Sequence, residues 1–192
     1  CLTLPGVISD PAHCRKIVDV VVSKMGRLDI LVNNAAHQML FDQIEEIPDE
    51  EWQKTFAINI HAMFYLSKAA MRHMENGGSI INTASVNSDD PSPALLAYAA
   101  TKGAIQNFTA GLAQMVAGRG IRVNCVAPGP VWTPLIPGSF DTRDVSQFGA
   151  NYPMGRPAQP VELASSYVML AEEMSSYVSG ATIAVTGGKP II

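Results

Sequence analysis

Short apolar runs alternate with longer amphipathic segments along the chain. The apolar runs are continuous, which is typical of parallel strands buried on both faces. Strands are expected at residues 28–32, 79–84, 121–127 and 181–186, with a strand end at 1–7. Helices are expected from Asp10, from Pro48, over residues 95–116 and over residues 160–172. Strands that alternate with helices predict an α/β fold, a doubly wound parallel sheet.

One segment breaks this alternation. Residues 128–155 are expected to form a loop, which is unusually long for a compact domain and therefore favours a functional role. Apolar side chains within it suggest a lid over a pocket: Leu135, Ile136, Pro137, Phe140, Phe148, Tyr152 and Met154.

Composition narrows the class of protein. The chain has 192 residues, 47% of them hydrophobic, so we expect residues 1–192 to form a single domain with one core. A net charge of -4 argues against nucleic acid or an anionic membrane as partner. Three unpatterned cysteines indicate reduced thiols and a cytoplasmic protein. The histidines show no metal-ligand spacing, so no metal site is expected.

Ser85, Tyr98 and Lys102 are the candidate chemical groups. Tyr98 and Lys102 lie four residues apart on an expected helix and therefore share a face. An ammonium near a phenol should lower a pKa that is ordinarily about 10 and make the tyrosine usable as an acid or base. Ser85, at the end of a strand, could hold the reacting oxygen of a carbonyl or alcohol. The alternative is a surface Tyr–Lys pair on an amphipathic helix.

Five ordered motifs connect these residues to a known family. An Asn-Asn-Ala-Ala turn follows a strand, Asn59 lies within a helix, and Ser85, Tyr98 and Lys102 follow in order. A Val-Ala-Pro-Gly-Pro stretch and a closing Gly-Gly complete the set. The chain resembles the short-chain dehydrogenase/reductases from about residue 5 to about residue 188. Tyr-Ala-Ala-Thr-Lys, Val-Ala-Pro-Gly-Pro and Ser-Ser-Tyr-Val most resemble bacterial NADP-linked aldehyde and alcohol reductases.

The resemblance implies a role for each matching residue. Tyr98 would exchange a proton with the substrate oxygen, Ser85 would hydrogen-bond that oxygen, and Lys102 would keep the phenol acidic. Asn59 would leave a backbone carbonyl free for a water near Lys102; its alternative is a polar residue at a helix kink. NADP or NAD is the implied cofactor, with NADP favoured. Its implied contacts are Asn33, Ala35, Ala36, Tyr98, Lys102, Pro128, Gly129, Val131 and Thr133.

Some residues near these motifs have two interpretations. Asn33 and Asn34 could instead hold a strand-to-loop turn through side-chain hydrogen bonds. His37 and Gln38 could touch a substrate, although a lone loop histidine is usually only exposed. Asp89 and Asp90 could rim a pocket, although a solvated turn is the more common role for such a stretch.

The chain also departs from the family pattern. It has no Thr-Gly-x-x-x-Gly-x-Gly turn, whose N–H groups would hold a pyrophosphate, and Val7 stands where an acidic residue should contact adenine. The resemblance therefore implies a partial domain that lacks the first strand–helix units.

Three functions are compatible with these features. The first is hydride transfer between a nicotinamide cofactor and a small carbonyl or alcohol substrate, by a homotetramer or homodimer. The alternative is a truncated or degenerate subunit that binds no cofactor and acts as an assembly partner. A lyase or epimerase that uses the same site is a further possibility.

Overall fold

Parallel strands form the centre of the molecule. The computed structural model describes residues 1–140 and 142–190. Among these residues the sheet has four strands, in the order β1 (Ile30–Asn33), β2 (Ser79–Thr83), β3 (Arg122–Pro128) and β4 (Thr182–Val185). Every neighbouring pair is parallel. β3 is buried along its whole length, as its continuous apolar run indicates.

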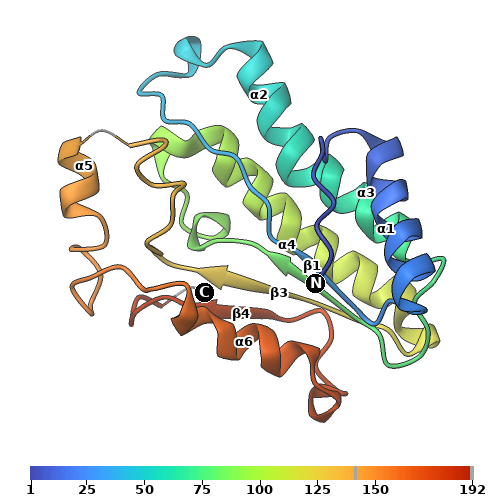
Figure 1. The fold of residues 1–192 in the computed structure, drawn as a ribbon. Helices are drawn as coiled ribbons and strands as arrows, with labels where there is room; N and C mark the ends of the chain where they lie inside the picture. The colour runs from blue at the N-terminus through green and yellow to red at the C-terminus, as the bar shows by residue number, and fades with distance from the viewer. Residues whose placement is uncertain (141, 191–192) are drawn as a thin grey trace.

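Helices cover both faces of the sheet. The α-helices are α1 (Pro11–Met25), α2 (Asp49–Phe56), α3 (Ala62–Ala70), α4 (Leu96–Val116), α5 (Thr142–Gln147) and α6 (Val161–Ala171). α1, α3 and α4 lie on one side of the sheet and α6 lies on the other (Figure 1). The doubly wound α/β prediction is therefore confirmed.

Short helical turns complete the backbone. The 3-10 turns are η1 (Ile44–Glu46), η3 (Val86–Ser88), η4 (Pro93–Leu95), η5 (Ala117–Arg119) and η6 (Glu173–Ser175), and η2 (Ala57–His61) is a π-helical turn between α2 and α3. The long helix expected from Pro48 is thus continuous in direction but changes its hydrogen-bond pattern at η2. Single π turns of this kind occur often at functional sites.

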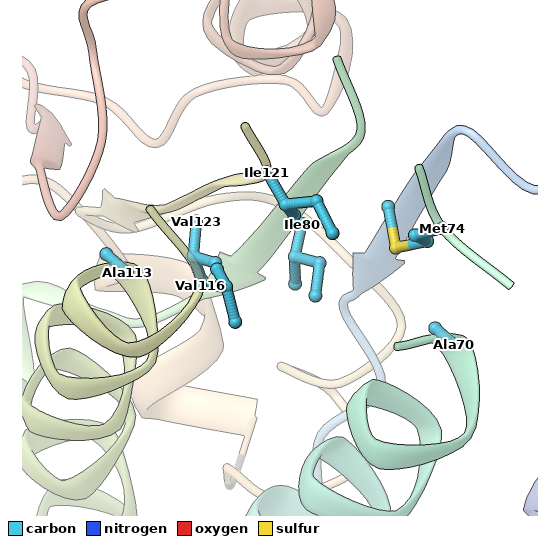
Figure 2. Packing of buried hydrophobic residues seen from close by; sticks show 7 residues of the cluster. All are labelled: Ala70, Met74, Ile80, Ala113, Val116, Ile121 and Val123. Atoms are coloured by element: carbon cyan, nitrogen blue, oxygen red, sulfur yellow. The ribbon is translucent and has the colours of Figure 1, made fainter. Parts of the chain in front are cut away.

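Figure 2 shows the main core between the sheet and the helices α3 and α4. Its buried members are Ala70, Met74, Ile80, Ala113, Val116, Ile121 and Val123. Small alanines on the helices allow the backbones to approach the strands, and the branched side chains of β2 and β3 fill the space between them. This core fixes α4 against β3 and so fixes the position of the residues that α4 carries.

Two sequence-based expectations about local structure are wrong. Residues 1–7 form no strand, because no described strand pairs with them. β1 accordingly lies at one edge of the described sheet, where Ile30 and Val32 are each 45% exposed. The segment 128–155 is not a plain loop, because it contains α5 and several turns. Among the described residues, the search for a helix long and apolar enough to span a bilayer finds none.

Candidate active site

A cavity of about 720 Å³ opens at the carboxyl ends of β2 and β3. The loop after β1, the start of α4, the segment after β3 and one side of α6 complete its walls. Most of the residues proposed from sequence line it: Ala35, Ala36, Ser85, Tyr98, Lys102, Pro128, Gly129, Val131 and Thr133. Ligands of open α/β sheets bind at this end of the strands, so topology brings these separate motifs to one place.

Ser85 is positioned by the turn that follows β2. It is the N-cap of η3, and its Oγ accepts a hydrogen bond from the backbone N–H of Asn87 at 3.2 Å. The Asn87 side-chain amide lies 3.5 Å from the same oxygen. Ser85 is only 6% exposed, yet it lines the cavity. Its hydroxyl also hydrogen-bonds Tyr98, a contact that by itself lowers the pKa of the phenol.

Tyr98 and Lys102 face the cavity from the first turns of α4, as their spacing predicts. The Lys102 ammonium nitrogen lies 5.2 Å from the centre of the Tyr98 ring. The same nitrogen donates a hydrogen bond to the Thr83 carbonyl at 2.7 Å. Lys102 is 2% exposed, so its amine is buried beside the Tyr98 phenol and the end of β2. The interpretation as a surface Tyr–Lys pair is therefore wrong.

The pKa of Tyr98 differs from the sequence-based expectation. Burial raises it to about 12 and outweighs the hydrogen bond from Ser85. Burial likewise lowers the pKa of Lys102 to about 7. A lysine that is only partly protonated near neutral pH, and that spends one N–H on a carbonyl, cannot supply the expected full charge. The prediction that the pKa of the phenol falls is thus wrong for the unliganded protein. Tyr98 keeps its proton there at neutral pH.

Asn59 lies outside the cavity lining, in the π turn η2, where it is 2% exposed. Its Oδ1 accepts the His37 backbone N–H at 2.7 Å and its Nδ2 donates to the His37 carbonyl at 2.9 Å. Nδ2 also donates to Thr101 Oγ1, which in turn donates to the Tyr98 carbonyl at 2.7 Å. The Asn59 side chain therefore joins the loop after β1 to the first turns of α4, as a positioning group.

Asn33 also lies away from the cavity. Its Nδ2 donates to Asn82 Oδ1 at 2.8 Å and to Ser67 Oγ at 3.3 Å, so it ties β1 to β2 and α3. Asn34 does reach the cavity, and its Oδ1 accepts a hydrogen bond from Thr83 Oγ1 at 3.0 Å. These contacts match the turn-holding interpretation of both asparagines.

Sequence reasoning missed several polar contacts around the site. The hydroxyl of Tyr167, on α6, lies 2.7 Å from Thr83 Oγ1. The imidazole of His37 pairs with Glu51 on α2, and Thr55 also bonds that carboxylate at 3.3 Å. The Ser-Ser-Tyr-Val motif marked Tyr167, but no pattern identifies its hydroxyl partner. Histidine and acid fourteen residues apart carry no recognisable signal.

Asp90 lies outside the cavity lining and forms an ion pair. Its carboxylate forms an ion pair with Lys189 at 2.5 Å, and the lysine nitrogen lies 5.4 Å from the centre of the Tyr152 ring. Asp90 is exposed and does not line the cavity, so it ties the turn after β2 to the C-terminal segment. Among the described residues, no group of three or more histidine, cysteine or acidic side chains could hold a metal ion.

The chain is similar to known proteins along nearly its whole length. A family model described as enoyl-(acyl carrier protein) reductase matches residues 3–189. The oxidoreductase YhdF of Bacillus subtilis, itself uncharacterised, is 50% identical over 189 residues, which is 98% of this chain and 65% of YhdF. The chloroplastic NADPH-dependent aldehyde reductase 1 of Arabidopsis thaliana is 47% identical over 188 residues, which is 97% of this chain and 65% of the relative.

A solved structure agrees with these matches. The glucose/ribitol dehydrogenase of Brucella melitensis, described as a short-chain dehydrogenase/reductase, superposes with a TM-score of 0.90 at 31% identity. That alignment covers 100% of this chain and 77% of the other. The chain spans about 65% of the length of the two curated relatives above. With the motifs, the site and these matches together, the chain belongs to the short-chain dehydrogenase/reductase family.

Proposed function

We propose that the protein is an NAD(P)-dependent oxidoreductase that interconverts a small carbonyl compound and its alcohol. The observation that carries this proposal is the convergence of Ser85, Tyr98 and Lys102 on one cavity, with Ser85 hydrogen-bonded to Tyr98. NADPH is the favoured cofactor, because a relative 47% identical to this chain bears the name NADPH-dependent aldehyde reductase.

Tyr98 acts as the acid in reduction. Its pKa of about 12 keeps the phenol protonated at neutral pH, so it has a proton to give to a substrate oxygen. Ser85 directs its hydroxyl to the same oxygen and stabilises the charge that develops there. In oxidation Tyr98 must first lose its proton to solvent, and the resulting phenolate then takes the proton from the alcohol.

Lys102 supports this exchange from within the protein. One of its N–H groups donates to the Thr83 carbonyl, and the protonated amine, which lines the cavity, has two further donors for a ligand. Protonation of Lys102 brings positive charge to within 5.2 Å of the phenol ring and favours the phenolate as it forms. Asn59 acts indirectly, through the loop after β1 and through Thr101.

The described residues would hold one half of a dinucleotide. Lys102 would hold the nicotinamide ribose, and Val131 and Thr133 would contact the carboxamide and the nearest phosphate. Ala35 and Ala36 line the cavity with small side chains, which would leave room for a ribose. The glycine-rich pyrophosphate turn is not in this sequence. When bound, the nicotinamide supplies or accepts the hydride, which no side chain can do.

Turnover is the direct test. The protein at its natural length would be assayed with NADPH and with NADH against a panel of simple aldehydes, by loss of reduced nicotinamide absorbance. We expect oxidation of NADPH that depends on the aldehyde. Dinucleotide binding without turnover would overturn redox chemistry and leave a lyase or epimerase. Absence of any dinucleotide binding would favour the alternative, a degenerate subunit that acts as an assembly partner.

We further propose that the protein is a homotetramer or a homodimer. Large apolar side chains are exposed around α6 and β4, among them Val168, Met174 and Tyr177, and across α3 and α4, among them Phe64 and Met115. Surfaces of this kind are typical of subunit interfaces. Light scattering during size exclusion should give two or four subunits, and a monomer at micromolar concentration would contradict the proposal.

A further inference from the structure

Two loops that are far apart in the chain meet beside the cavity. Gln38, in the loop after β1, donates a hydrogen bond from Nε2 to Oγ of Ser139 at 2.8 Å. Ser139 lies in residues 133–140, which we call the lid segment. The two residues are 101 positions apart, so the bond is a tertiary contact between two walls of the cavity, the loop after β1 and the segment after β3.

The lid segment is a compact series of turns. Its backbone bonds run from Ile136 N–H to the Thr133 carbonyl at 3.1 Å, and from Ser139 and Phe140 N–H to the Ile136 carbonyl at 3.1 and 2.9 Å. Ser139 Oγ donates to the Leu135 carbonyl at 2.7 Å. The Ser139 hydroxyl thus donates within the lid segment and accepts from Gln38. The turns of the lid segment and its contact with the loop after β1 therefore depend on the same group.

Apolar side chains of the lid segment form one wall of the cavity. Leu135, Ile136 and Phe140 all line it, and Ile136 is only 6% exposed. The Phe140 ring packs against that of Phe148 beyond α5, with centroids 5.7 Å apart. Movement of the lid segment would thus shift the surface that meets the substituent of a substrate.

The loop that carries Gln38 is itself held firmly. Asn59 binds both the N–H and the carbonyl of the preceding residue, His37, and the His37 imidazole pairs with Glu51. Gln38 is 5% exposed, so its amide has lost most of its contact with water. A buried amide without a partner is costly, and its bond to Ser139 therefore stabilises the lid segment in the position that the structure shows.

We infer that Gln38 is a positioning residue whose hydrogen bond to Ser139 latches the lid segment over the substrate and so sets the preference for substrates with an apolar substituent. This inference rests on the proposed function in taking the cavity as the substrate site. Its consequence is that the latch affects substrates that reach the Leu135–Ile136 wall more than substrates that are small and polar.

The first test needs no turnover. Hydrogen exchange measured by mass spectrometry would compare the lid segment in wild type, Gln38→Met, Ser139→Ala and the double variant, each at natural length. Either single change should speed exchange of the Ser139 and Phe140 amides about three- to tenfold, the equivalent of one net hydrogen bond. The double variant should be no faster than Ser139→Ala, because Ser139→Ala already removes the bond to Gln38 together with the bond to the Leu135 carbonyl. Gln114→Met, an exposed glutamine on α4, is the matched control.

The second test uses two probe aldehydes, benzaldehyde and glyceraldehyde. In the latch variants kcat/KM for benzaldehyde should fall about three- to tenfold, mainly through KM, while that for glyceraldehyde changes less. Unchanged exchange in both single variants, or effects that add in the double variant, would overturn the latch even if the enzyme turns over. If the latch variants exchange faster but the protein turns over no aldehyde, the contact between Gln38 and Ser139 is supported and only the proposed function is contradicted.

Discussion

Replacing Lys102 with methionine should stabilise the protein. Lys102 is 2% exposed, and burial lowers its pKa from 10.5 to about 7. At about 1.4 kcal/mol for each pH unit, holding this lysine protonated in the folded state costs about 5 kcal/mol. Methionine keeps the length of the side chain but loses the hydrogen bond to the Thr83 carbonyl, worth about 1–2 kcal/mol. The net gain near pH 6 should be roughly 3 kcal/mol.

The dependence on pH identifies the cause of this gain. Below the folded pKa of about 7, Lys102 is protonated in both states and the cost is complete. Between about 7 and 10.5 the unfolded chain binds more protons than the folded protein, so wild-type stability rises with pH. The advantage of Lys102→Met should therefore shrink by about 2–3 kcal/mol between pH 6 and pH 9.

Urea unfolding followed by tryptophan fluorescence measures this advantage directly, because Trp52 and Trp132 report on separate parts of the fold. Lys16→Met, at an exposed position on α1, is the control and should show no comparable gain. The reasoning fails if Lys102→Met is no more stable than wild type at pH 6, or if its advantage does not decline toward pH 9. The variant should also lose turnover, so stability and activity would change in opposite directions.

Three further predictions address other parts of the structure. Arg122→Met should destabilise the protein by about 2–4 kcal/mol in thermal unfolding, because the buried guanidinium bonds three carbonyls at the end of α6; an unchanged Tm would contradict that role. Gly149→Ala should cost about 1–3 kcal/mol, since φ is +79° and a Cβ would lie 2.6 Å from the Pro157 nitrogen. Gly118→Ala, where a Cβ meets nothing within 4 Å, should be nearly neutral by the same unfolding assay. Ser85→Ala should lower kcat about 100-fold with cofactor affinity retained, as fluorescence titration can check; loss of cofactor affinity instead would refute its assignment to the substrate oxygen.

Elements with strong local signals could be predicted from sequence. The helix expected at residues 95–116 is α4 (Leu96–Val116), and the apolar run 121–127 is β3 (Arg122–Pro128). The strand end expected at residues 1–7 failed because a strand also needs a neighbour, which local pattern does not reveal. α5 was missed because Thr142–Gln147 is a six-residue helix without a clear apolar period.

In the candidate site, too, features set by local spacing could be predicted from sequence, and features set by tertiary packing could not. Helical spacing predicted that Tyr98 and Lys102 share a face, and the position of Ser85 at the end of a strand predicted that it lies near them. The bond between Gln38 and Ser139 joins residues 101 positions apart, and neither residue type is unusual in a loop. The pKa of Lys102 depends on how completely the fold buries it, which spacing cannot give.

The role of Tyr98 as the proton donor is the central claim, and single-turnover reduction of an aldehyde by the NADPH-loaded protein tests it most directly. Tyr98→Phe removes one hydroxyl and should slow the reduction by at least about 100-fold while NADPH still binds. Tyr177→Phe, at a fully exposed position, makes the same change and should leave the rate intact. If Tyr98→Phe reduces the aldehyde at close to the wild-type rate, Tyr98 is not the acid and the mechanism proposed for this site is wrong.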